Sequence, residues 1–222
     1  MKSIVAIPCF NHNDYLPELI NKINSYIDID ILVIDDGSEN IVSKQIIFNE
    51  NKPNLHLIRN NKNSGKGYSL IKAFQYCKNN NYTHMITVDA DMQHHPSSIP
   101  EILNISLKYD LVYGMRNFKK HMPLQRVFSN VLTSKIISLI CKNKIYDSQC
   151  GLRRYNISKF NYKDCIEMGY QFETEILLNS IDKSFSIKSV PINTIYNGSS
   201  SSINVILDTY RFIRCIIKAV LL

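Results

Sequence analysis

Two aspartates separated by one small residue, Asp89 and Asp91, are the side chains of this sequence that most clearly suggest chemistry. They directly follow the apolar run MITV at residues 85–88, which is typical of a buried strand. Open α/β sheets bind ligands in the crevice beyond the carboxyl ends of their strands. Neighbouring carboxylates repel each other unless a cation lies between them, and Mg²⁺ and Mn²⁺ prefer such oxygen ligands. The alternative is a polar turn, because Asp is also a common turn and helix-cap residue.

A second acidic pair, Asp35 and Asp36, follows the apolar run at residues 29–34. In addition, Lys66 stands between two glycines just before a helical pattern at residues 70–77. Glycines allow a close backbone approach, and a helix N-terminus favours anions. The spacing is not that of a P-loop, so a simple capped turn explains this segment equally well when it is considered alone.

Composition narrows the class of protein. The chain has 222 residues and a formal net charge of +7, with Lys and Arg dispersed along its length. This balance fits an anionic ligand, and the dispersed charge does not favour nucleic acid. Six cysteines without a Cys-x-x-Cys pair indicate free thiols in a reducing compartment. The N-terminus lacks a signal-peptide core, and no apolar run reaches about 18 residues, so we expect a cytoplasmic protein.

Strand-like and helix-like patterns alternate along most of the chain. This alternation predicts an α/β fold, with a mostly parallel sheet flanked by helices in a single domain at residues 1–202. Strands are expected at residues 3–7, 29–34, 55–58, 85–88, 111–114 and 187–192, and residues 147–155 lead into another strand-like piece. Helices are expected at residues 16–23, 41–48, 70–77 and 99–103, within the basic segment 119–144, and after residues 169–175.

The C-terminal segment, residues 203–222, is apolar with a narrow polar stripe. Its charged residues recur at steps of three and four and therefore share one helix face: Asp208, Arg211, Arg214 and Lys218. A wide apolar face with a basic edge suits a membrane surface. Packing on the domain, or on a second copy in a homo-oligomer, is the alternative.

The ordered set of motifs resembles glycosyltransferase family 2, whose fold is the Rossmann-like GT-A fold. The matching segments are IPCFN at 7–11, VIDDGS at 33–38, NSGKG at 63–67, VDADMQH at 88–94 and GMR at 114–116. Two later segments resemble the branch that contains dolichol-phosphate mannosyltransferase and the bacterial polyprenyl-phosphate sugar transferases. These are DSQCGLR at 147–153 and YQFETE at 170–175.

The resemblance implies a site for a nucleotide sugar and a metal ion. Pro8 and Phe10 match positions that line the base, and Asp36, with Asp35, matches a hydrogen-bond acceptor for base or ribose. The full donor set implied is Pro8, Phe10, Asp35, Asp36, Lys66, Asp89, Ala90, Asp91 and Arg116.

The implied cofactor is Mg²⁺ or Mn²⁺. Asp91 and Gln93 would hold the ion against the diphosphate, and Asp89 would reach it directly or through water. The ion would act as a Lewis acid on the leaving nucleotide. Asp89 and Asp91 are accordingly expected to be catalytic.

The acceptor determines whether a general base is needed. A hydroxyl acceptor needs one, and Glu175 or Glu173 is the candidate, with Glu175 preferred. A lipid phosphate is already ionised and needs cations instead. The resemblance implies that Arg126, Ser129 and Arg153 bind it.

These expectations describe a metal-dependent inverting enzyme that moves a hexose from a UDP- or GDP-linked sugar to a polyprenyl phosphate or another membrane-linked acceptor. It would be peripheral on the cytoplasmic face of the membrane. The alternatives are transfer to a sugar hydroxyl of a surface glycan, and a non-catalytic nucleotide-binding module.

Overall fold

The computed structural model describes residues 1–12, 14–42, 54–117, 124–182, 185–193 and 205–221. Within these residues, seven strands form one sheet in the order β3-β2-β1-β4-β6-β5-β7. The strands are β1 (Ser3–Cys9), β2 (Asp30–Asp35), β3 (Leu55–Arg59), β4 (His84–Thr87), β5 (Leu111–Arg116), β6 (Arg153–Asn156) and β7 (Ile187–Ile192).

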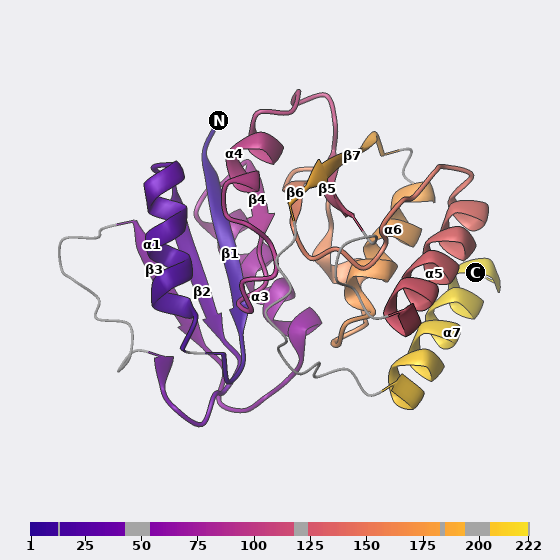
Figure 1. The fold of residues 1–222 in the computed structure, drawn as a ribbon, viewed down its shortest axis with the longest axis horizontal. Coiled ribbons are helices and arrows are strands. Elements are labelled where there is room, and N and C mark those ends of the chain that lie inside the picture. Colours follow the sequence, from indigo (N-terminus) through magenta and orange to yellow (C-terminus); the bar gives the residue numbers. More distant parts are fainter. Residues whose placement is uncertain (13, 43–53, 118–123, 183–184, 194–204, 222) are drawn as a thin grey trace.

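Helices cover both faces of the sheet (Figure 1). The helices are α1 (Leu16–Tyr26), α3 (Lys66–Asn79), α4 (Ser98–Leu103), α5 (Leu124–Cys141), α6 (Phe172–Asp182) and α7 (Val205–Leu221), with a 3-10 turn, η1 (Tyr162–Asp164). The helix expected at residues 41–48 lies almost entirely outside the described residues. None of the described helices is both long enough and apolar enough to cross a membrane.

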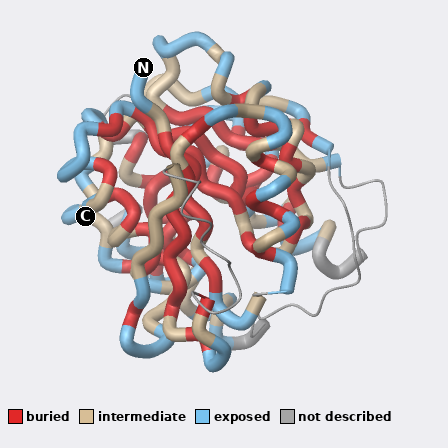
Figure 2. Tube along the Cα trace, turned by 90° about the vertical axis from the view of Figure 1, so that its left-hand side faces the viewer, coloured by how far each residue is buried: buried red, intermediate tan, exposed pale blue. Residues whose placement is uncertain are grey.

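Alternation along the strands produces two hydrophobic layers. In β1, Ile4 and Ala6 pack with α3, α5 and α6, whereas Val5 and Ile7 pack with α1 and α4. Successive side chains of a strand point to opposite faces, so a strand covered on both sides must be apolar throughout. Figure 2 shows the resulting buried interior surrounded by exposed segments.

Most strand pairs are parallel, which confirms the predicted fold class. β1 pairs in parallel with β2 and β4, β2 with β3, and β5 with β7. β6 is antiparallel to both β4 and β5, a feature that the sequence did not indicate. As a consequence, the segment that precedes β6 arrives at the edge where β1, β2, β4 and β5 end.

Candidate active site

The carboxyl ends of β1, β2 and β4 bring the two acidic pairs to one edge of the sheet. β1 lies between β2 and β4. The chain adds β2 and then β3 on one side of β1, and then adds β4 on the other side. Such a reversal is where open α/β sheets form their ligand crevice. We call this edge the donor edge; it contains the residues around Asp35, Asp89 and Asp91.

Asp89 is held by two partners. Its Oδ1 lies 2.5 Å from Lys66 Nζ, and its Oδ2 lies 3.4 Å from His94 Nε2. The segment before β6 also lies against it, since a Cβ atom at Gly151 would overlap both carboxylate oxygens. Thr87 Oγ1 fixes that approach by donating a 2.6 Å hydrogen bond to the Gly151 carbonyl. Position 151 therefore needs glycine in order to accommodate the Asp89 carboxylate.

Lys66 joins Asp89 to α6. Its ammonium also lies 3.1 Å from Glu173 Oε1, so it bridges two carboxylates. Burial alone would lower the pKa of Lys66, but the charges of Asp89 and Glu173 outweigh it and raise that pKa. Burial would likewise raise the pKa of Asp89, but the charge of Lys66 and the hydrogen bond from His94 hold it well below its usual range. Lys66 is therefore a cation, and Asp89 is an anion.

Asp91 has a different environment from Asp89. Burial, and next the charge of Asp89, raise the pKa of Asp91, although the Gln93 N–H donates a 3.0 Å hydrogen bond to its Oδ1. The turn between them contains Met92 in the left-handed region, with φ of 60°. This conformation is uncommon for a non-glycine residue. On balance, the turn thus presents a carboxylate whose ionised form is disfavoured by burial and by Asp89.

The carboxylates of Asp89 and Asp91 suit a divalent cation that is also bound by the substrate. No group of three His, Cys, Asp or Glu side chains in the described residues is arranged to hold an ion. Mg²⁺, however, is usually held by one or two carboxylates together with substrate phosphates, without a complete protein cage. A cation at Asp91 would offset the charge that burial and Asp89 disfavour, so the residues present fit this role.

Asp35 and Asp36 both have protein partners at the donor edge. The Asp35 carboxylate is bound by Arg59 and accepts a 2.9 Å hydrogen bond from the Ser38 N–H. Asp36 accepts hydrogen bonds from Asn60 Nδ2 at 2.8 Å, the Ser64 N–H at 3.0 Å and the Gly65 N–H at 2.8 Å. Asp36 therefore shapes the loop that leads into Lys66, in addition to the donor-binding role implied for it.

Pro8 and Phe10 lie at the end of β1. Pro8 is half-buried, whereas Phe10 is 37% exposed. The next residue, Asn11, ties this loop to the one after β2, because its N–H donates to Ser38 Oγ at 3.0 Å. The backbone next to Phe10 is thus held in place, while Phe10 itself remains partly exposed to solvent.

Two of the predicted arginines are internal. Arg116 Nε and Nη2 bind Asp147 Oδ2 and Oδ1 at 2.7 and 2.9 Å. Arg153 is fully buried and donates to the carbonyls of Cys150 (2.8 Å), Ser148 (2.6 Å) and Glu173 (2.8 Å). Both therefore fix the segment that contains Gly151.

The two glutamates of α6 point to different places. Glu173 lies at Lys66, whereas Glu175 accepts hydrogen bonds from the Ile166 N–H at 3.0 Å and the Glu167 N–H at 2.9 Å. Residues two apart on a helix face nearly opposite sides, which explains the separation. The structure places Glu173, the residue that the sequence did not favour, at the donor edge.

The two other acceptor candidates, Arg126 and Ser129, belong to α5. Ser129 is exposed on α5, and the side chain of Arg126 lies outside the described residues. His94 and Gly151 were not among the predicted site residues, although each stands inside a motif segment. Their membership of the segments 88–94 and 147–153 was the signal that the sequence offered.

Comparison with known proteins identifies the family of the chain. The family model described as Glycosyl transferase family 2 matches residues 4–166. An uncharacterised protein of Methanocaldococcus jannaschii is 32% identical over 212 residues, which is 90% of each chain. The UDP-N-acetylglucosamine–dolichyl-phosphate N-acetylglucosaminyltransferase of Methanococcus voltae is 28% identical over 217 residues, covering 88% of this chain and 86% of that one.

A solved structure supports the fold. Glucosyl-3-phosphoglycerate synthase of Mycobacterium tuberculosis, crystallised with Mn²⁺ and UDP-glucose, superposes with a TM-score of 0.75 and 15% identity. The match covers 98% of this chain and 78% of that one. The chain belongs to glycosyltransferase family 2, is a glycosyltransferase with the GT-A fold, and resembles the family's polyprenyl-phosphate sugar transferase branch.

Proposed function

We propose that this enzyme transfers a hexose from a UDP- or GDP-linked sugar to a polyprenyl phosphate, with Mg²⁺ or Mn²⁺ as cofactor, at the cytoplasmic face of a membrane. The relative from Methanococcus voltae supports the two substrate classes, because its name specifies a UDP-sugar and dolichyl phosphate.

The residues of the donor edge support the proposed binding of a nucleotide sugar and a metal ion. Asp91 and Gln93 would hold the metal ion, with Asp89 contacting it directly or through water. The ion would supply Lewis acidity at the diphosphate. Phe10 offers an open ring for the base, and Pro8 lies beside it on the same strand end. Lys66, at the N-terminus of α3, adds a fixed positive charge.

The acceptor half rests on one observation: neither candidate base is free. Glu175 is occupied by two backbone N–H groups, and Glu173 is paired with the Lys66 ammonium at 3.1 Å. A base must reach the proton that it removes. A phosphate acceptor is already ionised and needs no base, so it fits this site better than a hydroxyl. Arg126 and Ser129 remain our assignments for the acceptor phosphate.

The test is an activity assay that pairs UDP- and GDP-sugars with either a short-chain polyprenyl phosphate or a sugar acceptor, with and without Mn²⁺. We expect Mn²⁺-dependent transfer to the lipid phosphate alone. Transfer to the sugar hydroxyl, abolished in Glu173→Gln or Glu175→Gln, would overturn the lipid-phosphate assignment. Nucleotide binding without any sugar transfer would indicate a binding module.

A further inference from the structure

The C-terminal helix α7 turns polar residues toward the domain. Arg214 Nη2 lies 2.6 Å from Glu167 Oε1, and Gln171 Nε2 donates to Asp208 Oδ1 at 3.1 Å. Cys215, next to Arg214, is buried in the layer formed with α3, α5 and α6. The orientation of α7 is therefore fixed by contacts between residues 208 and 215.

This orientation leaves a row of apolar side chains in solvent. The row follows steps of three and four, so its members share one face of the helix. They are between 43% and 64% exposed: Leu207, Tyr210, Ile213 and Ile217. A helix that packs only on its own domain would turn such a row inward, so this face is available for another surface.

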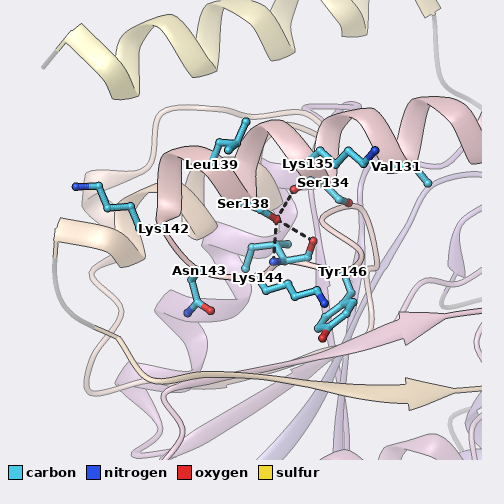
Figure 3. A pocket seen from close by; sticks show the side chains of 10 residues that line it. Val131, Ser134, Lys135, Ser138, Leu139, Lys142, Asn143, Lys144 and Tyr146 are labelled. Atoms are coloured by element: carbon cyan, nitrogen blue, oxygen red, sulfur yellow. Dashed lines mark hydrogen bonds between the residues drawn. The ribbon is translucent and has the colours of Figure 1, made fainter.

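A second apolar row lies on α5. Phe128, Leu132 and Leu139 are between 46% and 80% exposed, and their spacing places them on one face. Figures 1 and 3 both show α7 running beside α5, and Figure 3 shows Leu139 pointing from α5 toward α7. The two rows thus occur on neighbouring helices.

The C-terminal half of α5 also borders a cavity of about 560 Å³ (Figure 3). Its lining combines the aliphatic side chains of Val131, Leu139 and Ile145 with three lysines, Lys135, Lys142 and Lys144. All three lysines are exposed. This combination of cations around an apolar lining suits an anionic amphiphile.

The charge of α5 and α7 distinguishes between two possible partners of the apolar rows, a second copy of this chain and a membrane. Residues 124–146 contain no acidic residue, and the one acid in 205–221 is Asp208, whose carboxylate is bonded to Gln171. On α7, Lys218 is an exposed cation, and Arg214 is exposed as well although it is paired with Glu167. A second copy of this chain would set cations against cations, which is unfavourable. An anionic leaflet satisfies the cations and the apolar rows together.

We propose that the exposed apolar rows of α5 and α7, with the cations beside them, bind an anionic membrane leaflet; we call this region the docking surface. This inference rests on the proposed function, because a polyprenyl-phosphate acceptor is held in a membrane. Ser129, our acceptor assignment, lies on the same helix as the apolar row of α5.

The test is sedimentation of the full chain with vesicles of phosphatidylglycerol or of phosphatidylcholine. We expect binding to the anionic vesicles that weakens with salt. Ile213→Glu or Leu139→Glu should weaken it at least about tenfold, since each replaces an aliphatic side chain that would enter the leaflet with a carboxylate. Lys142→Gln should weaken it about fivefold. Leu107→Glu is the matched control, because Leu107 is 52% exposed but lies outside both helices, and it should bind like wild type.

Equal binding to both vesicle types, or wild-type binding by the Glu variants, would overturn the docking surface. A dimer in solution that Ile213→Glu dissociates would show that a second copy occupies it, with the same consequence. Vesicle binding without any transfer to a lipid phosphate would contradict the proposed function alone. Conversely, transfer to a water-soluble short-chain acceptor, unchanged in Ile213→Glu, shows that a loss of vesicle binding is not a loss of folding.

Discussion

The donor edge and the docking surface depart from ordinary protein architecture in opposite ways. At the donor edge, charged groups are withdrawn from water and neutralise one another, as in the contacts of Lys66 with Asp89 and Glu173. On the docking surface, apolar groups such as Tyr210 and Leu139 remain in water. Stability alone favours neither arrangement. We therefore propose that both regions serve partners outside the chain.

The two regions should respond differently to substitution. Removing one buried charge leaves its partners uncompensated, and the loss is large. Removing an exposed apolar side chain removes little that the folded state uses. Stability measurements therefore separate the regions, and activity and vesicle binding then assign a role to each.

The largest effect is expected at Lys66. Lys66→Met leaves two carboxylates without their cation, and the free energy of unfolding should fall by about 3–5 kcal/mol. Chemical denaturation measures this loss. Lys78→Met is the control, because Lys78 is exposed near the end of the same helix. A loss as small as that of the control would show that the Lys66 pairs do not stabilise the fold.

Asp91→Asn should lower kcat by about 100-fold or more, the scale of losing one electrostatic contact in a transition state.

The same variant should be more stable than wild type at neutral pH without metal. The raised folded-state pKa of Asp91 means that its ionisation destabilises the fold as pH rises above the unfolded value of about 3.9. The stability gain should therefore vanish near pH 3.

Thermal unfolding with and without Mn²⁺ tests the metal assignment for Asp91 separately from activity. Mn²⁺ together with UDP should raise the melting temperature of wild type by mass action, and should raise that of Asp91→Asn less. The exposed Asp28, changed to Asn, is the control and should behave like wild type. An equal shift in all three proteins would exclude Asp91 as the ligand.

Gly151→Ala should lower activity by about 10-fold to 100-fold, the usual range for residues that position a reactive group. The new Cβ would overlap the Asp89 carboxylate and displace it from Lys66. Overpacking of this kind also costs about 1–3 kcal/mol of stability. Gly169→Ala is the matched control, because its Cβ would come closest to the Gln171 side chain, at 3.1 Å.

The smallest effect on stability is expected on the docking surface. Ile213→Gln should change the free energy of unfolding by no more than about 0.5 kcal/mol, while vesicle binding decreases. Denaturation and sedimentation of the same preparation measure both quantities. A large destabilisation would mean that this row belongs to the core, and the contrast between the two regions would fail.

The sequence predicted much of the framework. Apolar runs that end in Asp35-Asp36 and Asp89-x-Asp91 indicated strands whose carboxyl ends meet, and parallel strands guarantee that meeting. The alternation of strands and helices predicted the α/β fold. These signals are local, because a strand or helix is recognised from the periodicity of its own residues.

Only the tertiary structure decided which residues meet at long range. Lys66 and Glu173 are 107 positions apart, and no local pattern links them. The sequence likewise did not show that Arg153 would be buried against carbonyls, that Glu175 would bind backbone N–H groups, or that α7 would turn an apolar row outward. Periodicity determines which side chains share a face, but the direction of that face depends on contacts with distant segments. The sequence by itself therefore determined the elements and the acids at their ends, and packing decided which charges are paired and which apolar side chains remain exposed.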